Sequence, residues 1–172
     1  MQQNNVRYSL INFYLKYISM KKLFPILLLP ILMAGCVKGV EPCTNATVAS
    51  EEPDIISFCT DHSIDYTKDP SGLYYQVLDP GTGASPSLTS TITVTYKSTF
   101  LDGTTLQNTT SPITGVLNQY ITGWQIGLQK IKKGGHILLI IPSSLAYGCG
   151  GYLGSVPSNS VLYFDITLID VQ

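Results

Sequence analysis

Charged residues are scarce in this sequence of 172 residues, and the formal net charge is only −1. Asp, Glu, Lys and Arg make up 12% of the chain, about half the share that is usual in globular domains. A disordered charged tail needs high net charge and few apolar residues, whereas 44% of this chain is hydrophobic. Phosphate contacts require a basic patch, and ten Lys and Arg residues in the whole chain are too few to form one easily. We therefore expect no nucleic-acid partner.

Motifs for hydrolysis and for metal binding are missing as well. The chain has no G-x-S-x-G nucleophile elbow, and its two histidines belong to no catalytic motif. We interpret His62 as a surface residue and His136, at the start of an apolar run, as a structural one. The spacing of the four cysteines matches no zinc site. We therefore expect neither a metal nor a cofactor.

Long hydrophobic runs are absent too, because the longest one is too short to span a membrane. Residues 24–35, FPILLLPILMAG, carry no charge, whereas a spanning helix needs about 20 apolar residues. A run of this length directly after Lys21 and Lys22 is typical of a secretory signal, whose apolar part has about 7–15 residues. It ends in Met33-Ala34-Gly35-Cys36, which resembles the signal of bacterial lipoproteins, with Met33 where Leu is preferred.

This resemblance implies a signal peptide over residues 20–35, cleavage before Cys36 and lipidation of its thiol. An ordinary signal peptide, with Cys36 as a bystander, is the alternative. Because the signal is complete from Met20, we interpret residues 1–19 as an extension from a wrongly assigned start codon; a long natural leader is the other explanation. The expected location is the bacterial cell envelope, with a lipid anchor in a bilayer, preferably the outer membrane.

The part after the signal is acidic and has an odd number of thiols. Residues 37–172 hold six lysines and eleven acids, a net charge of −5. Once Cys36 is lipidated, Cys43, Cys59 and Cys149 remain, so one thiol is unpaired or pairs between molecules. A bridge between Cys43 and Cys59, which are close in sequence, is one prediction, and three free thiols are the alternative. We interpret Cys149 as a small loop residue in preference to a redox sensor.

Residues 36–70 are predicted to form a lipid-anchored tether and a short helical lead-in. Small and polar residues suit the tether. Residues 49–64 carry a weak helical pattern, with Ser50 as the expected N-cap and acids in the first turn. Three aspartates are expected on the solvated side of this segment: Asp54, Asp61 and Asp65.

From residue 71 onward the pattern changes to strands. Alternation of apolar and polar residues over 91–100 predicts a half-buried strand, and Asp102-Gly103 predicts a hairpin whose return strand begins at Thr104. The other expected elements are strands at 73–78, 136–141 and 161–171, a helix over 123–133 and a long functional loop over 143–160. Together these elements predict an antiparallel α+β domain over residues 71–172.

Six short motifs stand in this domain in a fixed order. They are Val94-Thr-Tyr96, Asp102-Gly103-Thr, Leu117…Ile121-Thr-Gly123-Trp124…Gly127-Leu128, Lys133-Gly134-Gly135, Ile141-Pro142…Ala146-Tyr147-Gly148 and Val156-Pro157…Leu162-Tyr-Phe164-Asp165. Each is weak alone, but as an ordered set they resemble the FKBP-type peptidyl-prolyl cis-trans isomerases over about residues 71–171. The resemblance implies an FKBP-like fold, in which a twisted antiparallel β-sheet wraps around one short α-helix.

The resemblance also implies a function, the isomerisation of X–Pro peptide bonds in exported proteins at the cell envelope. The uncatalysed reaction takes about 10–100 s, because twisting the C–N bond removes amide resonance. No bond breaks, so an apolar pocket that binds the twisted amide better than the planar one is sufficient. Proline-containing polypeptides are the implied partners, and the macrolide ligands of the family are implied as well.

Position by position, the resemblance implies a pocket with Trp124 as its floor. The implied catalytic residues are Tyr96, Trp124, Tyr147 and Phe164, and the implied substrate-binding residues are Leu106, Gln107, Ile121, Tyr152 and Val156. The Ile121 N–H and the Tyr147 hydroxyl match the groups that bond to ligand carbonyls.

Two departures from the family pattern predict a wider pocket and weak to moderate activity. The family usually has Phe-Asp where this chain has Leu106-Gln107, so a bond to the Tyr96 hydroxyl is possible but the negative charge is lost. It often has another Phe where this chain has Gly115. The alternative function is therefore an envelope chaperone module that binds peptides with little turnover; a purely structural lipoprotein has little support beyond the anchor.

Overall fold

Residues 42–109 and 111–172 are described by the computed structural model of this chain. Their first helix is α2 (Val48–Asp61). A reciprocal capping box starts it: the Ser50 N–H donates to Thr47 Oγ1 and the Thr47 N–H donates to Ser50 Oγ, both at 3.1 Å. The predicted helical segment is thus present, but Thr47 is its N-cap and Ser50 lies inside it. The predicted signal peptide, the extension before it and the lipidation site Cys36 lie outside the described residues.

The described residues form a seven-stranded antiparallel sheet. Its strands are β1 (Thr67–Lys68), β2 (Tyr74–Asp79), β3 (Thr91–Phe100), β4 (Thr105–Asn108), β5 (Ile113–Val116), β6 (His136–Ile141) and β7 (Leu162–Val171). The order across the sheet is β1-β2-β6-β7-β3-β4, and β5 pairs with β3. The predicted α+β fold is therefore confirmed, including the hairpin at Asp102-Gly103, which joins β3 to β4.

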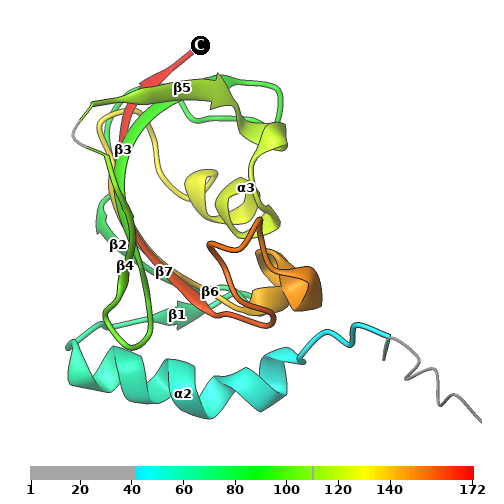
Figure 1. Ribbon diagram of the computed structural model, residues 1–172. Coiled ribbons are helices and arrows are strands. Elements are labelled where there is room, and N and C mark those ends of the chain that lie inside the picture. The colour runs from blue at the N-terminus through cyan, green and yellow to red at the C-terminus, as the bar shows by residue number, and fades with distance from the viewer. Residues whose placement is uncertain (1–41, 110) are drawn as a thin grey trace, which may run out of the picture. The chain divides into compact units, whose positions relative to one another are not determined.

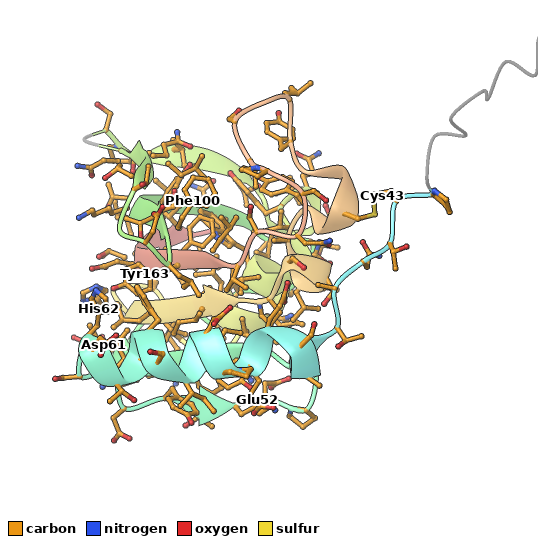
Figure 2. All side chains as sticks on the ribbon, turned by 60° about the horizontal axis from the view of Figure 1, so that its bottom comes forward. Cys43, Glu52, Asp61, His62, Phe100 and Tyr163 are labelled. Atoms are coloured by element: carbon orange, nitrogen blue, oxygen red, sulfur yellow. A yellow bond between two sulfur atoms is a disulfide. The ribbon has the colours of Figure 1, made fainter. Side chains whose placement is uncertain are left out.

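The two faces of this sheet carry separate apolar cores. On the inner face lies α3 (Thr122–Leu128), whose Trp124 shares a core with Leu139 of β6. On the outer face lies α2, whose Phe58 shares a second core with Leu138. Because successive strand residues point to opposite faces, the uninterrupted apolar run of β6 serves both cores. Figures 1 and 2 show α3 inside the curve of the sheet and α2 along its outer side.

The position of Trp124 depends on the close approach of α3 to β6. Glycines stand at the contact: a Cβ added to Gly123 or Gly127 would lie 2.5 Å from a side-chain atom of Ile141 or Leu139. Real Cβ atoms do not approach other atoms so closely, so larger residues here would push α3 off the sheet. The helix ends at Leu128, five residues before the predicted end. No described helix is long and apolar enough to cross a bilayer.

Short elements were not predicted. The strands β1 and β5 are two and four residues long and show no clear alternation. Three 3₁₀ turns, η1 (Leu117–Gln119), η2 (Ser143–Leu145) and η3 (Gly148–Gly150), also appear among the described residues. The last two lie in the predicted long loop before β7.

A disulfide joins Cys43 to Cys149, so the predicted Cys43–Cys59 bridge is wrong (Figure 2). Cys59 is a free, buried thiol in the outer core. It lies eleven residues into the helix that starts at Val48, about 17 Å along the axis. A disulfide needs Cα atoms about 4.4–6.8 Å apart, so the helix itself separates this pair. Cys149, which the sequence suggested to be a small loop residue, forms this disulfide.

Hydrogen bonds extend the attachment made by this disulfide. Asn45 Oδ1 accepts from the Cys149 N–H at 2.8 Å, and Asn159 Oδ1 accepts from the Ala46 N–H at 3.0 Å. Asn159 Nδ2 also donates to the Thr44 carbonyl oxygen at 3.1 Å. Residues 43–46, which we call the strap, are therefore fastened to the loop that follows η2.

Candidate functional site

Three aromatic rings from three elements of the inner core meet around one cavity. They are Tyr96 of β3, Trp124 of α3 and Phe164 of β7. The Trp124 ring meets the other two edge to face, with centroids 5.0 Å from Tyr96 and 5.4 Å from Phe164. The indole is only 3% exposed and its Nε1–H has no acceptor within the described chain. Trp124 thus lies at the bottom of the cavity, where the sequence predicts it.

The cavity has a volume of about 240 Å³ and no charged lining residue. Its lining residues are Tyr96, Gln119, Tyr120, Ile121, Trp124, Tyr147, Tyr152 and Phe164. All four residues predicted as catalytic are among them, together with Ile121 and Tyr152. Elsewhere in the described residues, no cluster of three or more His, Cys, Asp or Glu side chains is placed to hold a metal ion. The site offers apolar surface and hydrogen-bond donors.

Tyr96 is held from behind by β4. Its hydroxyl donates to Gln107 Oε1 at 2.5 Å, because Gln107 lies opposite Ser98 in the β3–β4 ladder. Burial raises the pKa of Tyr96, so the hydroxyl keeps its proton at neutral pH. Gln107 is exposed and Leu106 packs against the inner core, and neither lines the cavity. Gln107 therefore supports Tyr96 from outside the cavity, and Leu106 contributes to the inner core.

Two hydrogen-bond donors in the cavity wall are free. The Ile121 N–H, at the N-cap of α3, has no acceptor within the described chain. The Tyr147 hydroxyl likewise has no partner there, and burial raises its pKa, so it remains a donor at neutral pH. These are the two donors that the sequence predicts for ligand carbonyls.

The loop between η3 and β7 forms the rim. Tyr152 and Val156 exchange backbone hydrogen bonds of 2.9 and 3.1 Å, which close a tight turn. The Tyr152 side chain is 49% exposed and its ring lies 5.0 Å from that of Tyr147. Val156 is buried in the inner core and lies outside the cavity lining. Of this predicted pair, only Tyr152 reaches the cavity.

Tyr120 is the main site residue that the sequence interpretation missed. Its ring stacks on Trp124 with centroids 5.0 Å apart. Gln125 Nε2 donates to the Tyr120 carbonyl oxygen at 2.7 Å and fixes this residue at the end of η1. The sequence feature that could have identified Tyr120 is its position directly before Ile121, inside the motif that begins at Leu117. Gln119 of the same turn also lines the cavity and was missed too.

Comparison with known proteins identifies relatives of this domain. The family described as FKBP-type peptidyl-prolyl cis-trans isomerase matches residues 83–169. The chain is 45% identical over 105 residues to FKBP-type peptidyl-prolyl cis-trans isomerase FkpA of Escherichia coli K12, which covers 59% of this chain and 38% of FkpA. It is 40% identical over 106 residues to outer membrane protein MIP of Legionella longbeachae, which covers 60% of this chain and 46% of MIP. The chain therefore spans less than half the length of these relatives.

Solved structures agree with the sequence relatives. The crystal structure of FkpA from Escherichia coli matches with a TM-score of 0.65 and 38% identity, over 73% of this chain and 61% of that chain. The peptidyl-prolyl cis-trans isomerase of Pseudomonas syringae matches with a TM-score of 0.63 and 28% identity, over 75% and 98% of the two chains. These similarities confirm the predicted FKBP-like fold.

Proposed function

Because this chain belongs to the FKBP-type peptidyl-prolyl cis-trans isomerase family, we propose that it catalyses the cis–trans isomerisation of X–Pro bonds in polypeptides. The observation that carries the proposal is the uncharged aromatic cavity over Trp124, with two free donors in its wall. A reaction that breaks no bond needs no nucleophile, and the lining contains no charged group that could act as a base. The cavity instead suits the binding of a strained amide.

In this proposal the proline ring rests on the Trp124 indole, with the rings of Tyr96 and Phe164 beside it. The aromatic walls exclude water from the amide. A twisted amide has lost resonance and part of its polarity, so it loses less hydration than the planar amide when it enters the cavity. The cavity therefore stabilises the transition state more than the ground state, which is what lowers the barrier.

The two free donors orient the substrate. The Ile121 N–H and the Tyr147 hydroxyl donate to carbonyl oxygens of the bound peptide and hold its backbone while the C–N bond turns. Tyr96 differs from Tyr147 because its proton is already donated to Gln107. Tyr96 thus contributes its ring, and Gln107 keeps that ring in place without adding negative charge. We infer that this missing charge limits the rate to weak or moderate values.

A protease-coupled proline isomerisation assay on residues 37–172 tests the activity. We expect acceleration by the wild type, a loss of about tenfold in kcat/KM for Trp124→Leu and a loss of a few-fold for Tyr147→Phe. Tyr66→Phe, which removes a phenol oxygen near the outer core, is the matched control and retains the wild-type rate. Folded protein that gives no acceleration would overturn the proposal.

We further propose that the protein assists folding of exported polypeptides at the bacterial cell envelope, anchored by lipid on Cys36. The Cys43–Cys149 disulfide supports export, because such bonds persist in oxidising compartments. The relative named outer membrane protein MIP supports a location at the envelope. Labelling of cells with radioactive palmitate tests the anchor: Cys36→Ala should abolish the label, and Cys59→Ala should retain it. Label on Cys36→Ala protein would contradict the proposed attachment.

A module that binds peptides with little turnover is the second candidate. The family usually has an acidic residue where this chain has Gln107, and the absence of that charge favours this second function. Peptide affinity that depends on Trp124, without any gain in isomerisation rate, would identify this function.

A further inference from the structure

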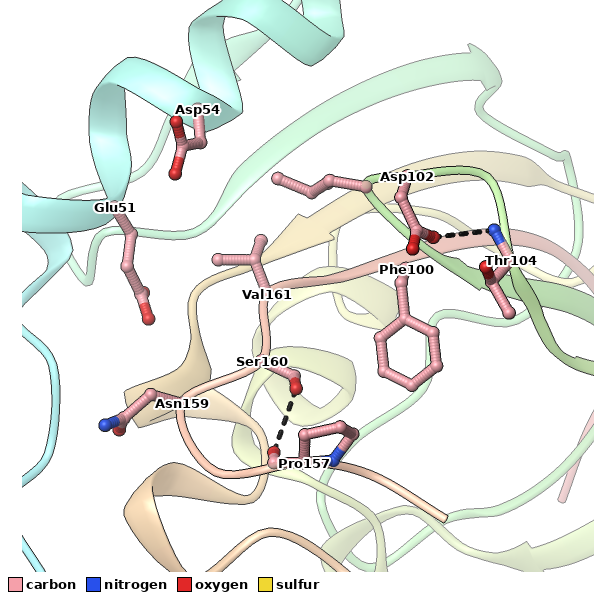
Figure 3. Close-up of a pocket in the computed structure, with 10 residues that line it drawn as sticks. Glu51, Asp54, Phe100, Asp102, Thr104, Pro157, Asn159, Ser160 and Val161 are labelled. Atoms are coloured by element: carbon pink, nitrogen blue, oxygen red, sulfur yellow. Dashed lines mark hydrogen bonds between the residues drawn. The ribbon is translucent and has the colours of Figure 1, made fainter.

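A larger hollow of about 500 Å³ lies at one end of the sheet and shares no lining residue with the aromatic cavity (Figure 3). It is an open hollow bordered by α2, by the β3–β4 hairpin and by residues 157–161. We call it the acidic groove. Its lining residues are Glu51, Asp54, Phe100, Leu101, Asp102, Thr104, Pro157, Asn159, Ser160 and Val161.

The charge of the acidic groove is of one sign only. Three carboxylates line it and no Lys, Arg or His side chain does. Figure 3 shows Glu51 and Asp54 extending from α2, and Asp102 on the hairpin with its carboxylate hydrogen-bonded to the Thr104 N–H. Hydrogen bonds from Thr104, including its N–H at 2.8 Å, lower the pKa of Asp102, so this group is ionised at neutral pH. A cation is the complementary ligand for such a lining.

Glu51 adds an observation that is independent of the charge count. The residue is only 7% exposed. Its Oε2 accepts from the Ser143 N–H at 3.0 Å, but its Oε1 has no hydrogen-bond partner within the described chain. A buried carboxylate oxygen without a partner is costly, and a donor from a ligand would remove that cost. The groove therefore contains an acceptor that the chain itself leaves unsatisfied.

The strand β3 connects the groove to the aromatic cavity. Tyr96, Ser98 and Phe100 point to the same face, and their pairing with β7 is regular from Tyr96↔Ile166 to Phe100↔Leu162. Tyr96 lines the cavity and Phe100 lines the groove. Four residues of strand span about 13 Å, a distance that an extended peptide covers in about four residues. A polypeptide with its proline on Trp124 can therefore place a side chain in the groove.

We propose that the acidic groove is a second subsite for the polypeptide substrate and binds an Arg or Lys side chain about four residues from the isomerised proline. The inference rests on the proposed function and names the substrate class more closely. The guanidinium or ammonium group donates to Glu51 Oε1 and to the carboxylates of Asp54 and Asp102. Phe100 and Pro157 offer apolar surface for the aliphatic part of the basic side chain.

Peptide binding to the full chain tests the subsite. The probes are eleven-residue peptides with one central Leu-Pro, carrying Arg four residues before or four residues after the proline, and matched peptides with Gln in the same places. We expect one of the two Arg peptides to bind about fivefold more tightly than its Gln partner at low salt, with the advantage shrinking in high salt.

Variants assign the effect to the groove. Asp54→Asn combined with Asp102→Asn should remove the preference for Arg, and Glu51→Gln should reduce it while keeping an acceptor for the Ser143 N–H. Asp65→Asn is the control: it removes the same charge from an exposed residue outside the groove and should retain the preference.

A short Ala-Leu-Pro-Phe substrate separates this inference from the proposed activity, since it fills the aromatic cavity but is too short for the groove. Equal Kd values for the Arg and Gln peptides, or an Arg preference that survives in the double variant, overturn the subsite, whatever the isomerisation rate is. If the isomerisation of the short substrate is not accelerated, the proposed activity is overturned, whatever the Kd values of the longer peptides are.

Discussion

The ring of Tyr120 lies nearly parallel to the Trp124 indole, at an interplanar angle of 21°. Its hydroxyl occupies the space beside Gly115: a Cβ added there would lie 2.5 Å from Tyr120 Oη. The sequence predicts a wider pocket because Gly115 stands where the family often has Phe. In the structure the ring of Tyr120, directly after η1, occupies the space that the missing side chain leaves. Glycine is required at position 115, because any side chain there would collide with the Tyr120 hydroxyl.

We expect Gly115→Ala to displace Tyr120 from Trp124 and to lower kcat/KM about threefold, because overpacking forces a stacked ring to move. Tyr120→Phe removes the atom that would clash first, so the alanine should cost less in that background. A double-mutant cycle measured with the isomerisation assay gives the coupling. Additive effects of the two substitutions would contradict the close contact.

A carboxylate in place of Gln107 should raise the rate. It would accept a stronger hydrogen bond from the Tyr96 hydroxyl and place negative charge beside the cavity, as the family pattern has it. We expect Gln107→Asp to increase kcat/KM about threefold relative to Gln107→Asn, which has the same length without the charge. Equal rates for this pair would show that the charge is not what limits turnover.

Much of this site follows from the sequence, because each motif fixes both a side chain and the element that carries it. Trp124, Tyr96 and Phe164 stand on a helix and two strands, and all three line the one cavity that the family resemblance implied. Tyr120 was missed because its role depends on the absence of a side chain at Gly115, a contact between segments that no local pattern shows.

The disulfide was mispredicted for a related reason. Closeness in sequence favours Cys43 and Cys59, but the helix between them directs Cys59 into the outer core and leaves Cys43 before its start. The attachment of the strap also depends on tertiary structure. Asn45 and Asn159 are 114 residues apart in the sequence, and no sequence pattern links them.

Loss of the Cys43–Cys149 bond should destabilise the domain strongly. The two cysteines are 106 residues apart in sequence. Closing a loop of about this length stabilises the fold by about 5 kcal/mol in the chain-entropy model. Urea unfolding of Cys43→Ser combined with Cys149→Ser measures the difference in unfolding free energy. Cys59→Ser is the comparison that alters a thiol without opening the ring. An unfolding midpoint unchanged in the double variant would contradict the covalent attachment.

The reactivity of thiols offers a further check on Cys59. Burial raises the pKa of this thiol to about 11, so its thiolate is rare at neutral pH. We expect the folded domain to react with Ellman's reagent very slowly and the urea-unfolded domain to release one equivalent at once. Rapid reaction in the folded state would place Cys59 outside the core.

Acid should weaken the link between Asp69 and Lys130. Their salt bridge of 2.7 Å lowers the pKa of Asp69 from 3.8 to about 2. Because the folded-state pKa is depressed, the stabilisation is present above pH 3.8 and is lost as the pH falls through about 2. Urea unfolding between pH 5 and pH 2 should show this loss. In Lys130→Met the decrease in unfolding free energy over this pH range should be about 1 kcal/mol smaller. Lys133→Met, which frees the more exposed Asp170, should change the profile less.

The position of β7 determines how this protein can be made. β7 follows every other strand in the sequence, yet it separates β6 from β3 in the sheet. A growing chain that lacks it has two half-sheets, each with an unpaired edge that only β7 can cover. The ring closed by Cys43 and Cys149 can already exist at that stage, since both cysteines precede residue 162. The aromatic cavity, which needs Phe164, is therefore completed only after nearly the whole domain has been synthesised.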